Sequence, residues 1–272
     1  MSNDVISAPQ QNNHTAGSAY SVPAIHRTLD IIELLTQQRT LTVSEVGRQF
    51  GIPKSSAYAI LQTLKSRGYV EKDALDRYSL SFRLFTLGAT LVDSLDIRHE
   101  VHALLEELTD KARMTGHVAI REHNCPIYID KVEILEALRL TTWIGKQMPL
   151  HSTSMGKALL AFLPEEEINR VLAEYPLTSF TPKTITDATA LKEDLAKTRV
   201  QGYATCNEEN EIGVRGVAAP LFNNSGKVVA AVNLGASKFH IRGKDMTQLG
   251  TLVRTYALKM SIQLGYRAPN RP

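Results

Sequence analysis

Cysteine is nearly absent from the 272-residue sequence, which contains only Cys125 and Cys206. The two residues are far apart and form no C-x-x-C pair, which excludes a disulfide framework and a structural zinc site. The sequence also lacks an apolar run of the roughly 18 to 20 residues that cross a bilayer, and no basic segment followed by a hydrophobic one opens it. We therefore expect a cytoplasmic protein that is neither secreted nor embedded in a membrane.

Catalytic motifs are missing as well. The segment "LHSTSMGKALLAFL" at 150–163 contains a Gly-Lys pair, but a histidine stands five residues before Gly156 and Ala158 follows the lysine, so it is not a P-loop. It also lacks the G-x-S-x-G pattern of a serine nucleophile. His99 and His102 stand as H-E-V-H, which differs from the zinc-binding H-E-x-x-H. These absences predict a protein that is not an enzyme and that binds neither a metal nor a cofactor.

An excess of charge of one sign is also lacking, since the formal net charge is only +3. Residues 21–87 carry nine Lys and Arg against six Asp and Glu, whereas residues 88–272 carry 22 against 21. The composition, 43% hydrophobic and 22% charged, is typical of a soluble protein with one large or two smaller domains. Residues 1–20 are polar and predict a tail. The N-terminal bias is compatible with a module that contacts phosphate groups.

The sequence after this tail has the pattern of two helices. Thr42 and Glu45 have the spacing of a capping box, in which each side chain binds a free backbone N–H of the other residue, and they predict a helix over 43–50. Before it, apolar residues recur at helical spacing over 22–37, at Ile25, Leu29, Ile32 and Leu35.

A third helix and a hairpin follow. Gly51 can adopt the left-handed conformation that ends a helix, and Pro53 can begin the next one, over 54–67. After Gly68, the runs "YVEKD" and "RYSL", joined by "ALD", predict a two-stranded hairpin. This order of elements over 21–83 is the layout of a winged helix-turn-helix, whose third helix enters the major groove of DNA.

The candidate DNA-binding residues are polar or basic side chains of the second helix, the third helix and the hairpin. They are Ser44, Lys54, Ser55, Ser56, Tyr58, Gln62, Lys65 and Arg77. Polar residues at the start of such a third helix lie near base edges, and basic residues contact phosphates. Two alternatives stay open: 22–83 could be a small helical domain with solvated polar faces, and Tyr58 could pack against the hairpin.

A helical linker over 84–96 and a second domain over 97–266 complete the predicted organisation, with a short tail at 267–272. The linker leucines could form a dimer seam or cover the N-terminal domain; they are Leu84, Leu87, Leu91 and Leu95. The second domain combines a long first helix, a final helix over 244–264 and strand-like runs. Two of these runs, "GVRGVAAPLF" and "KVVAAVNLGA", are joined by a hairpin loop at 223–226, which predicts an α+β fold on an antiparallel sheet.

The segment "HSTSMGK" has the features of a helix start. Ser152, Thr153 or Ser154 is the candidate cap, and Gly156 would allow a close approach. The unpaired N–H groups of such a helix end attract a carboxylate without reacting with it. His151 could orient this helix start, contact a ligand, or be a hydrogen-bonded structural histidine.

Together these segments resemble the IclR family of bacterial transcriptional regulators, over about 21–265. Five segments carry the resemblance: "GIPKSSAYAILQTLKSRGYV", "GKQMPLHSTSMGKALLAFL", "FTPKTITD", "GYATCNEENEIGVRGVAAPLF" and "GKVVAAVNLG". The resemblance implies a winged helix-turn-helix joined by a helical linker to a GAF-like effector domain. It also implies a homodimer or homotetramer on a palindromic double-stranded DNA operator, acting as repressor or activator.

The resemblance further implies a small organic acid as effector, with Leu140 and Met148 as apolar walls of its pocket. The implied effector-binding residues are Leu140, Met148, Ser154, Met155, Cys206, Gly216, Asn233 and Gly235. We therefore expect a transcriptional regulator of a catabolic operon. The alternative is an enzyme of small-carboxylate metabolism with a DNA-binding appendage.

Overall fold

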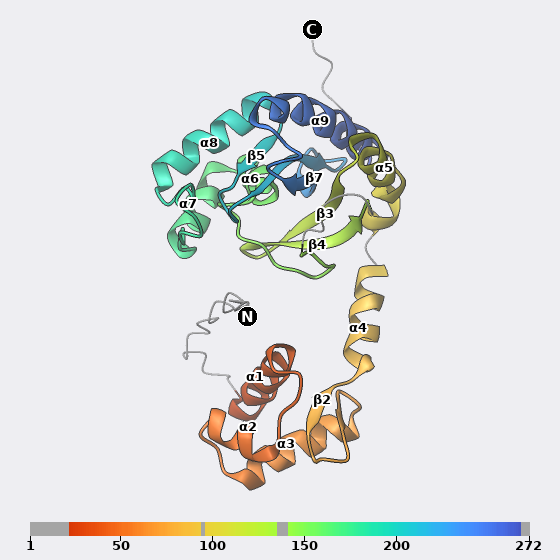
Figure 1. Ribbon diagram of the computed structural model, residues 1–272, viewed down its shortest axis with the longest axis vertical. Helices are drawn as coiled ribbons and strands as arrows, with labels where there is room; N and C mark the ends of the chain where they lie inside the picture. Colours follow the sequence, from red (N-terminus) through yellow and green to blue (C-terminus); the bar gives the residue numbers. More distant parts are fainter. Residues whose placement is uncertain (1–21, 94–95, 135–140, 268–272) are drawn as a thin grey trace. The chain divides into compact units, whose positions relative to one another are not determined.

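The chain divides into two compact units, Met1–Thr90 and Leu91–Pro272. The structure is a computed structural model, and it describes residues 22–93, 96–134 and 141–267. Helix α4, Phe82–Asp93, crosses the division, which falls inside the linker predicted over 84–96. Each unit has its own hydrophobic core, so we describe them separately (Figure 1).

The first unit consists of three helices followed by a hairpin, as the sequence predicts. Its elements are α1 Pro23–Gln37, α2 Val43–Gln49, α3 Lys54–Ser66, β1 Val70–Lys72 and β2 Tyr78–Leu80. The strands are antiparallel, with Val70 opposite Leu80, and Leu41 exchanges two backbone hydrogen bonds with Tyr78 at 2.8 and 2.9 Å. The winged helix-turn-helix prediction is confirmed.

Local signals in the sequence set the ends of these helices. The Thr42 N–H donates to Glu45 Oε2 at 2.7 Å, and the Glu45 N–H donates to Thr42 Oγ1 at 3.3 Å, which completes the predicted capping box of α2. Gly51 has a φ of +60°, the left-handed conformation expected after a helix end. Pro53 then precedes the first residue of α3.

In α1, the residues that are buried in the core of the first unit differ from the apolar set at helical spacing in the sequence. Ile31 and Leu35 are buried, whereas Ile25 and Leu29 are 57% and 52% exposed. Helical spacing identifies the helix, but it does not determine which turns meet a packing partner. The buried side of α3 consists of Ala57, Leu61 and Leu64.

The second unit is built on a five-stranded antiparallel sheet with strand order β4-β3-β7-β6-β5. The strands are β3 Thr115–Glu122, β4 Cys125–Val132, β5 Ala204–Asn207, β6 Val214–Phe222 and β7 Val228–Ser237. The helices are α5 Asp96–Ala112, α6 Ser154–Ala161, α7 Glu165–Glu174, α8 Ala188–Gln201 and α9 Met246–Gln263, with a 3-10 turn η1 at Gly243–Asp245. The α+β prediction with an antiparallel sheet is therefore confirmed.

Helices cover both faces of this sheet. Val217 and Ala219 of β6 pack in one core cluster with residues of α5 and α9, whereas Ala218 packs with α6 in another. This alternation follows from the two-residue period of a strand. Helices α7 and α8 pack against the outer side of α6, and Figure 1 shows these layers. The sheet face that meets the start of α6 is the one that positions the site.

Three sequence-based expectations fall outside the described residues. These are the first four residues of the strand-like run "ALRLTT" at 137–142, the position of Leu140, and the side chains of Leu91 and Leu95 in the linker. Across the described ranges, no helix combines the length and the apolar composition that a bilayer crossing needs.

Candidate functional site

The exposed side of α3 and the start of α2 present most of the predicted DNA-binding side chains. Six of the eight are exposed: Ser44, Lys54, Ser55, Ser56, Tyr58 and Lys65. Ser44 and Tyr58 line one hollow of about 240 Å³ between α2, α3 and the hairpin, together with Lys72. Lys72, which the sequence analysis missed, pairs with Asp76 at 2.5 Å, and this hydrogen bond raises the pKa of the lysine.

The other two predicted DNA-binding residues are hydrogen-bonded within the first unit. Gln62 Nε2 donates to the Tyr78 hydroxyl at 2.9 Å, and Arg77 Nε donates to Thr40 Oγ1 at 2.8 Å. Both side chains fasten the hairpin to the helices. This placement accounts for them without a DNA contact.

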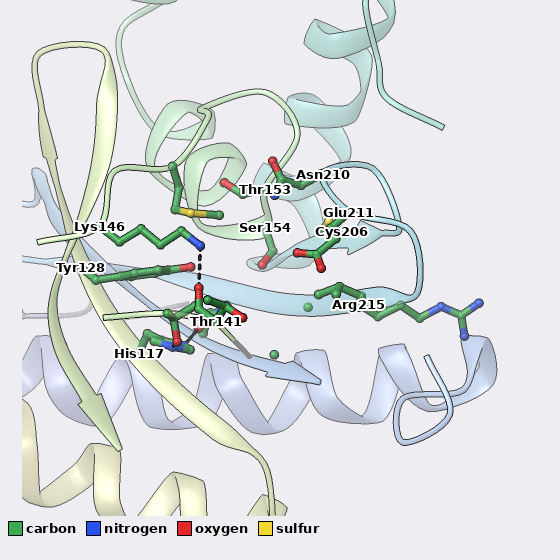
Figure 2. Close-up of a pocket in the computed structure, with 16 residues that line it drawn as sticks. His117, Tyr128, Thr141, Lys146, Thr153, Ser154, Cys206, Asn210, Glu211 and Arg215 are labelled. Atoms are coloured by element: carbon green, nitrogen blue, oxygen red, sulfur yellow. Dashed lines mark hydrogen bonds between the residues drawn. The ribbon is translucent and has the colours of Figure 1, made fainter. Parts of the chain in front are cut away.

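A pocket of about 140 Å³ lies in the second unit, between the sheet and the start of α6 (Figure 2). Its walls come from β3, β4, the segment 141–148, the first turn of α6, the loop after β5, and strands β6 and β7. Six of the eight predicted effector-binding residues line it: Met148, Ser154, Cys206, Gly216, Asn233 and Gly235. The fold therefore brings together residues that lie up to 87 positions apart in the sequence, from 148 to 235.

Strand register and two glycines create the floor of this pocket. Cys206 pairs with Gly216, and Gly216 pairs with Gly235, so the three residues form one row across β5, β6 and β7. A Cβ atom at Gly216 would lie 3.0 Å from Ser154 Oγ. Because the central positions of the row lack side chains, space remains between the sheet and α6.

The start of α6 is capped by Thr153, one of the three predicted alternatives. Thr153 Oγ1 accepts a hydrogen bond from the Gly156 N–H at 3.0 Å and donates to the Pro149 carbonyl at 2.7 Å. Ser154 is therefore the first helical residue, not the cap, and it faces the pocket. Its N–H belongs to the first turn, which has no carbonyl partner within the helix.

The structure differs from the expectation at Met155 of the α6 motif and agrees with it at Gly156. Met155 does not line the pocket; it is 1% exposed and packs in the core with Tyr128 and Leu159, because the next residue along a helix points about 100° away. Gly156 allows a close approach, as the sequence predicts, and the approaching group is the backbone of Leu150. A Cβ there would lie 2.2 Å from the Leu150 carbonyl oxygen, so the glycine permits two backbone segments to cross.

His117, a pocket residue that the sequence analysis missed, is neutral. Burial lowers its pKa to about 4. Its Nδ1 lies 3.0 Å from Asn233 Oδ1, its Nε2 lies 2.8 Å from Thr142 Oγ1, and its ring stacks on Tyr128. A neutral imidazole that donates to Asn233 and accepts from Thr142 satisfies both bonds. Asn233 Nδ2 then remains as a donor beside Gly216, 3.7 Å from the Cβ position there.

Two basic residues line the pocket, but their charged groups have different surroundings. Lys146 Nζ projects into it and donates to the Thr141 carbonyl at 2.6 Å (Figure 2). The Arg215 guanidinium turns away, with Nε bonded to Asn207 Oδ1 and Nη1 to the Ile241 carbonyl, both at 2.8 Å. Among the basic residues lining the pocket, Lys146 is thus the one whose charge faces the space.

The loop between β5 and β6, residues 208–213, is held from outside the pocket. Lys157 of α6 is 1% exposed and binds the carboxylates of Glu209 and Asp194, each at 2.9 Å. Burial lowers the pKa of Lys157, but the two carboxylates outweigh it and raise the pKa. Glu208 accepts hydrogen bonds from Lys183 and the Gly213 N–H, which lower its pKa to about 2.

Two histidines singled out in the sequence, His151 and His102, have structural roles. His151 Nε2 donates to the Thr178 carbonyl at 2.9 Å, which favours the interpretation of a hydrogen-bonded structural residue. His102 Nδ1 lies 2.7 Å from Asp130 Oδ2, where it ties α5 to β4. Within the described ranges, no three His, Cys, Asp or Glu side chains gather in a way that could hold a metal ion.

Sequence reasoning missed several pocket residues, and two of them, Lys146 and Glu211, lie inside the segments that carry the family resemblance. His117, Lys146 and Glu211 come from a strand, an irregular segment and a loop, and they converge only through the fold. His117 carried a weak signal, because strand periodicity places it on the same face as Ala119, which packs near α6. Lys146 and Glu211 carried none.

Comparisons with known proteins cover both units. Residues 24–74 match the family description "IclR helix-turn-helix domain", and residues 89–262 match "Bacterial transcriptional regulator IclR C-terminal". The HTH-type transcriptional regulator XynR of Escherichia coli K12 is 34% identical over 91% of this chain and 99% of its own length.

Solved structures share the fold. The crystal structure of the Thermotoga maritima IclR is 30% identical, with a TM-score of 0.74 over 89% of this chain and 98% of the other. An IclR homologue from Microbacterium hydrocarbonoxydans, solved in complex with 4-hydroxybenzoate, is 24% identical and has a TM-score of 0.76. The match covers 89% of this chain and 98% of that homologue. At that identity the likeness concerns the fold alone.

Proposed function

The chain belongs to the IclR family of bacterial transcriptional regulators, and we propose that a small organic acid bound in the second unit controls how tightly the first unit binds its DNA operator. The proposal includes a homodimer or homotetramer on a palindromic site, because a two-fold operator matches a two-fold protein. A catabolic operon is the proposed target. Repression and activation are both compatible with this winged helix-turn-helix domain.

The exposed side of α3 supports DNA binding. Ser55, Ser56 and Tyr58 stand near the start of the helix that enters the major groove in this fold, and Lys54 and Lys65 add positive charge beside them. Side chains on base edges determine sequence preference, whereas lysines on phosphates strengthen binding to any duplex. We assign these two roles to the serines with Tyr58 and to the lysines, respectively.

The pocket at the start of α6 carries the effector proposal. The Ser154 N–H, its hydroxyl, Asn233 Nδ2 and Lys146 Nζ supply hydrogen-bond donors around one small cavity. A helix N-terminus and an ammonium group both favour an anion. Met148 and Cys206 form a less polar part of the pocket wall.

The same pocket argues against the enzyme alternative. A covalent reaction would need an activated nucleophile, and the thiol in the pocket is Cys206. Burial raises the pKa of this thiol, and Sγ donates to the Ser152 carbonyl at 3.2 Å. A protonated thiol is a weak nucleophile, so the site favours holding a ligand over reacting with it.

The proposal is tested at the first residue of α6. Thr153 has a ψ of 147°, which allows a proline to follow, and a proline at the first helical position removes an N–H while keeping the helix. Ser154→Pro is expected to bind the effector acid about tenfold more weakly than Ser154→Ala, because a charge-assisted hydrogen bond is lost. The Ala variant is the matched control, since it loses only the hydroxyl.

The readouts are calorimetric affinity for the acid and anisotropy-based affinity for operator DNA. Without acid, all three proteins are expected to bind DNA equally. Equal acid affinity in the wild type, Ser154→Ala and Ser154→Pro would remove the helix start from the site.

A further inference from the structure

The space in the pocket lies between one cation and one anion. Figure 2 shows Lys146 entering from one side, and the Glu211 carboxylate facing the space from the other, close to Ser154. Burial lowers the pKa of Lys146, and the negative charge of Glu211 counteracts this lowering. The two charged groups therefore interact electrostatically across the cavity. A ligand in this space must therefore satisfy a carboxylate as well as an ammonium group.

We propose that the effector is a hydroxylated monocarboxylic acid, whose carboxylate lies at Lys146 and the start of α6 and whose hydroxyl groups donate to Glu211. Glu211 is then the residue that determines specificity among small acids. This inference rests on the proposed effector function and names the chemical class of its ligand.

The carboxylate of Glu211 excludes the two other simple classes of acid. A dicarboxylate would bring its second negative charge toward a fixed negative charge, which like-charge repulsion disfavours. An alkyl or aryl monocarboxylate would approach Glu211 with C–H groups. The Glu211 carboxylate would then lose bound water without gaining a hydrogen-bond donor. Hydroxyl groups provide the missing donors.

The rest of the lining fits a ligand rich in hydroxyl groups. Asn233 is 7% exposed, and its Nδ2 donates to no acceptor among the residues that the structure describes, so it can bind a hydroxyl oxygen. The Ser154 hydroxyl and the side chain of Asn210 add further polar partners. A volume of about 140 Å³ is small beside the roughly 300 to 1,000 Å³ of pockets for drug-sized ligands, which favours a short chain.

Glu211 occupies a held position. Its neighbour Glu209 is fixed by Lys157, and the carbonyls of Glu208 and Glu209 accept hydrogen bonds from Thr181 and Thr184 at 2.7 and 2.6 Å. The Glu211 carbonyl accepts the Val214 N–H at 3.2 Å. A loop whose backbone is fixed before the ligand arrives loses little conformational entropy on binding, and it keeps Glu211 beside the pocket.

The test compares three classes of acid of equal chain length, from four to six carbons. These are the straight-chain alkanoates butyrate to hexanoate, the dicarboxylates succinate to adipate, and the aldonates threonate to gluconate. Affinities for the full-length chain are measured by calorimetry for the wild type, Glu211→Gln and, as a control remote from the pocket, Glu193→Gln. Glu211 is exposed, so its substitution is expected to leave folding intact.

For the wild type and Glu193→Gln, we expect the best aldonate to bind at least about tenfold more tightly than the matched alkanoate and dicarboxylate. In Glu211→Gln the preference over the dicarboxylate is expected to fall about tenfold, because the repulsion is gone. A wild-type preference for an alkanoate or dicarboxylate, or an unchanged preference in Glu211→Gln, would overturn the ligand class while acid binding itself stands. If none of the nine acids binds, the effector function fails, and this inference fails with it.

Discussion

At the scale of single residues, His117 connects the pocket to the stability of the fold. Burial lowers the pKa of its imidazole from 6.5 to about 4, so between these values the unfolded chain binds a proton that the folded chain does not. The neutral histidine thus stabilises the fold above about pH 6.5, and this contribution is lost as the pH falls toward 4. The loss between pH 7.5 and pH 4.5 is about 2 to 3 kcal/mol.

His117→Gln removes this titration and keeps a donor and an acceptor. Urea unfolding at pH 7.5 and pH 4.5 is expected to show that the free-energy advantage of the wild type over the variant is smaller by about 2 to 3 kcal/mol at the lower pH. The exposed His123, replaced in the same way, is the control and is expected to show little change. A wild-type advantage that is the same at both pH values would contradict the neutral, buried state of His117.

At the scale of elements, the start of α6 depends on a glycine where two backbone segments cross. Alanine normally stabilises a helix interior relative to glycine, by about 0.5 to 1 kcal/mol. At Gly156, however, the new Cβ would lie 2.2 Å from the Leu150 carbonyl oxygen, and backbone cannot move aside as a flexible side chain can. We expect Gly156→Ala to destabilise the second unit by about 1 to 3 kcal/mol.

The matched control is Gly88→Ala on α4, where no atom lies within 4 Å of the Cβ position. Thermal unfolding is expected to show a loss for Gly156→Ala and no loss for Gly88→Ala. Similar midpoints for the two variants would mean that the crossing at Leu150 tolerates a side chain.

The same element shows how far the sequence predicts the site. The polar run before Gly156 predicts a helix start, but three consecutive residues can serve as its cap, and only the structure selects Thr153. That shift by one residue sends Ser154 to the pocket and Met155 to the core. In α1, the apolar spacing likewise predicts the helix, but it does not predict that Ile25 and Leu29 are exposed. Burial depends on packing partners that are distant in sequence.

At the scale of the whole molecule, local patterns predict the order of elements more readily than the chemistry of the pocket. Helix caps, turn glycines and strand alternation are each encoded over a few residues. The winged helix-turn-helix of the first unit and the α+β fold of the second can therefore be predicted from them. Lys146 and Glu211 lie 65 positions apart and meet only after the sheet has formed. A resemblance to a family locates the pocket, whereas the way these two charges face its space follows from the fold.

We expect acid binding in the second unit to change the affinity of the first unit for a specific DNA sequence. The most direct measurement selects a duplex from a random pool with the full-length chain and then titrates it, at fixed salt, with and without a saturating amount of the tightest-binding acid. A scrambled duplex serves as the control. We expect the selected duplex to bind about 10³-fold or more tightly than the scrambled one, and the acid to change that affinity by about 5- to 150-fold. Failure to enrich any duplex, or an operator affinity that is identical with and without the bound acid, would contradict the account.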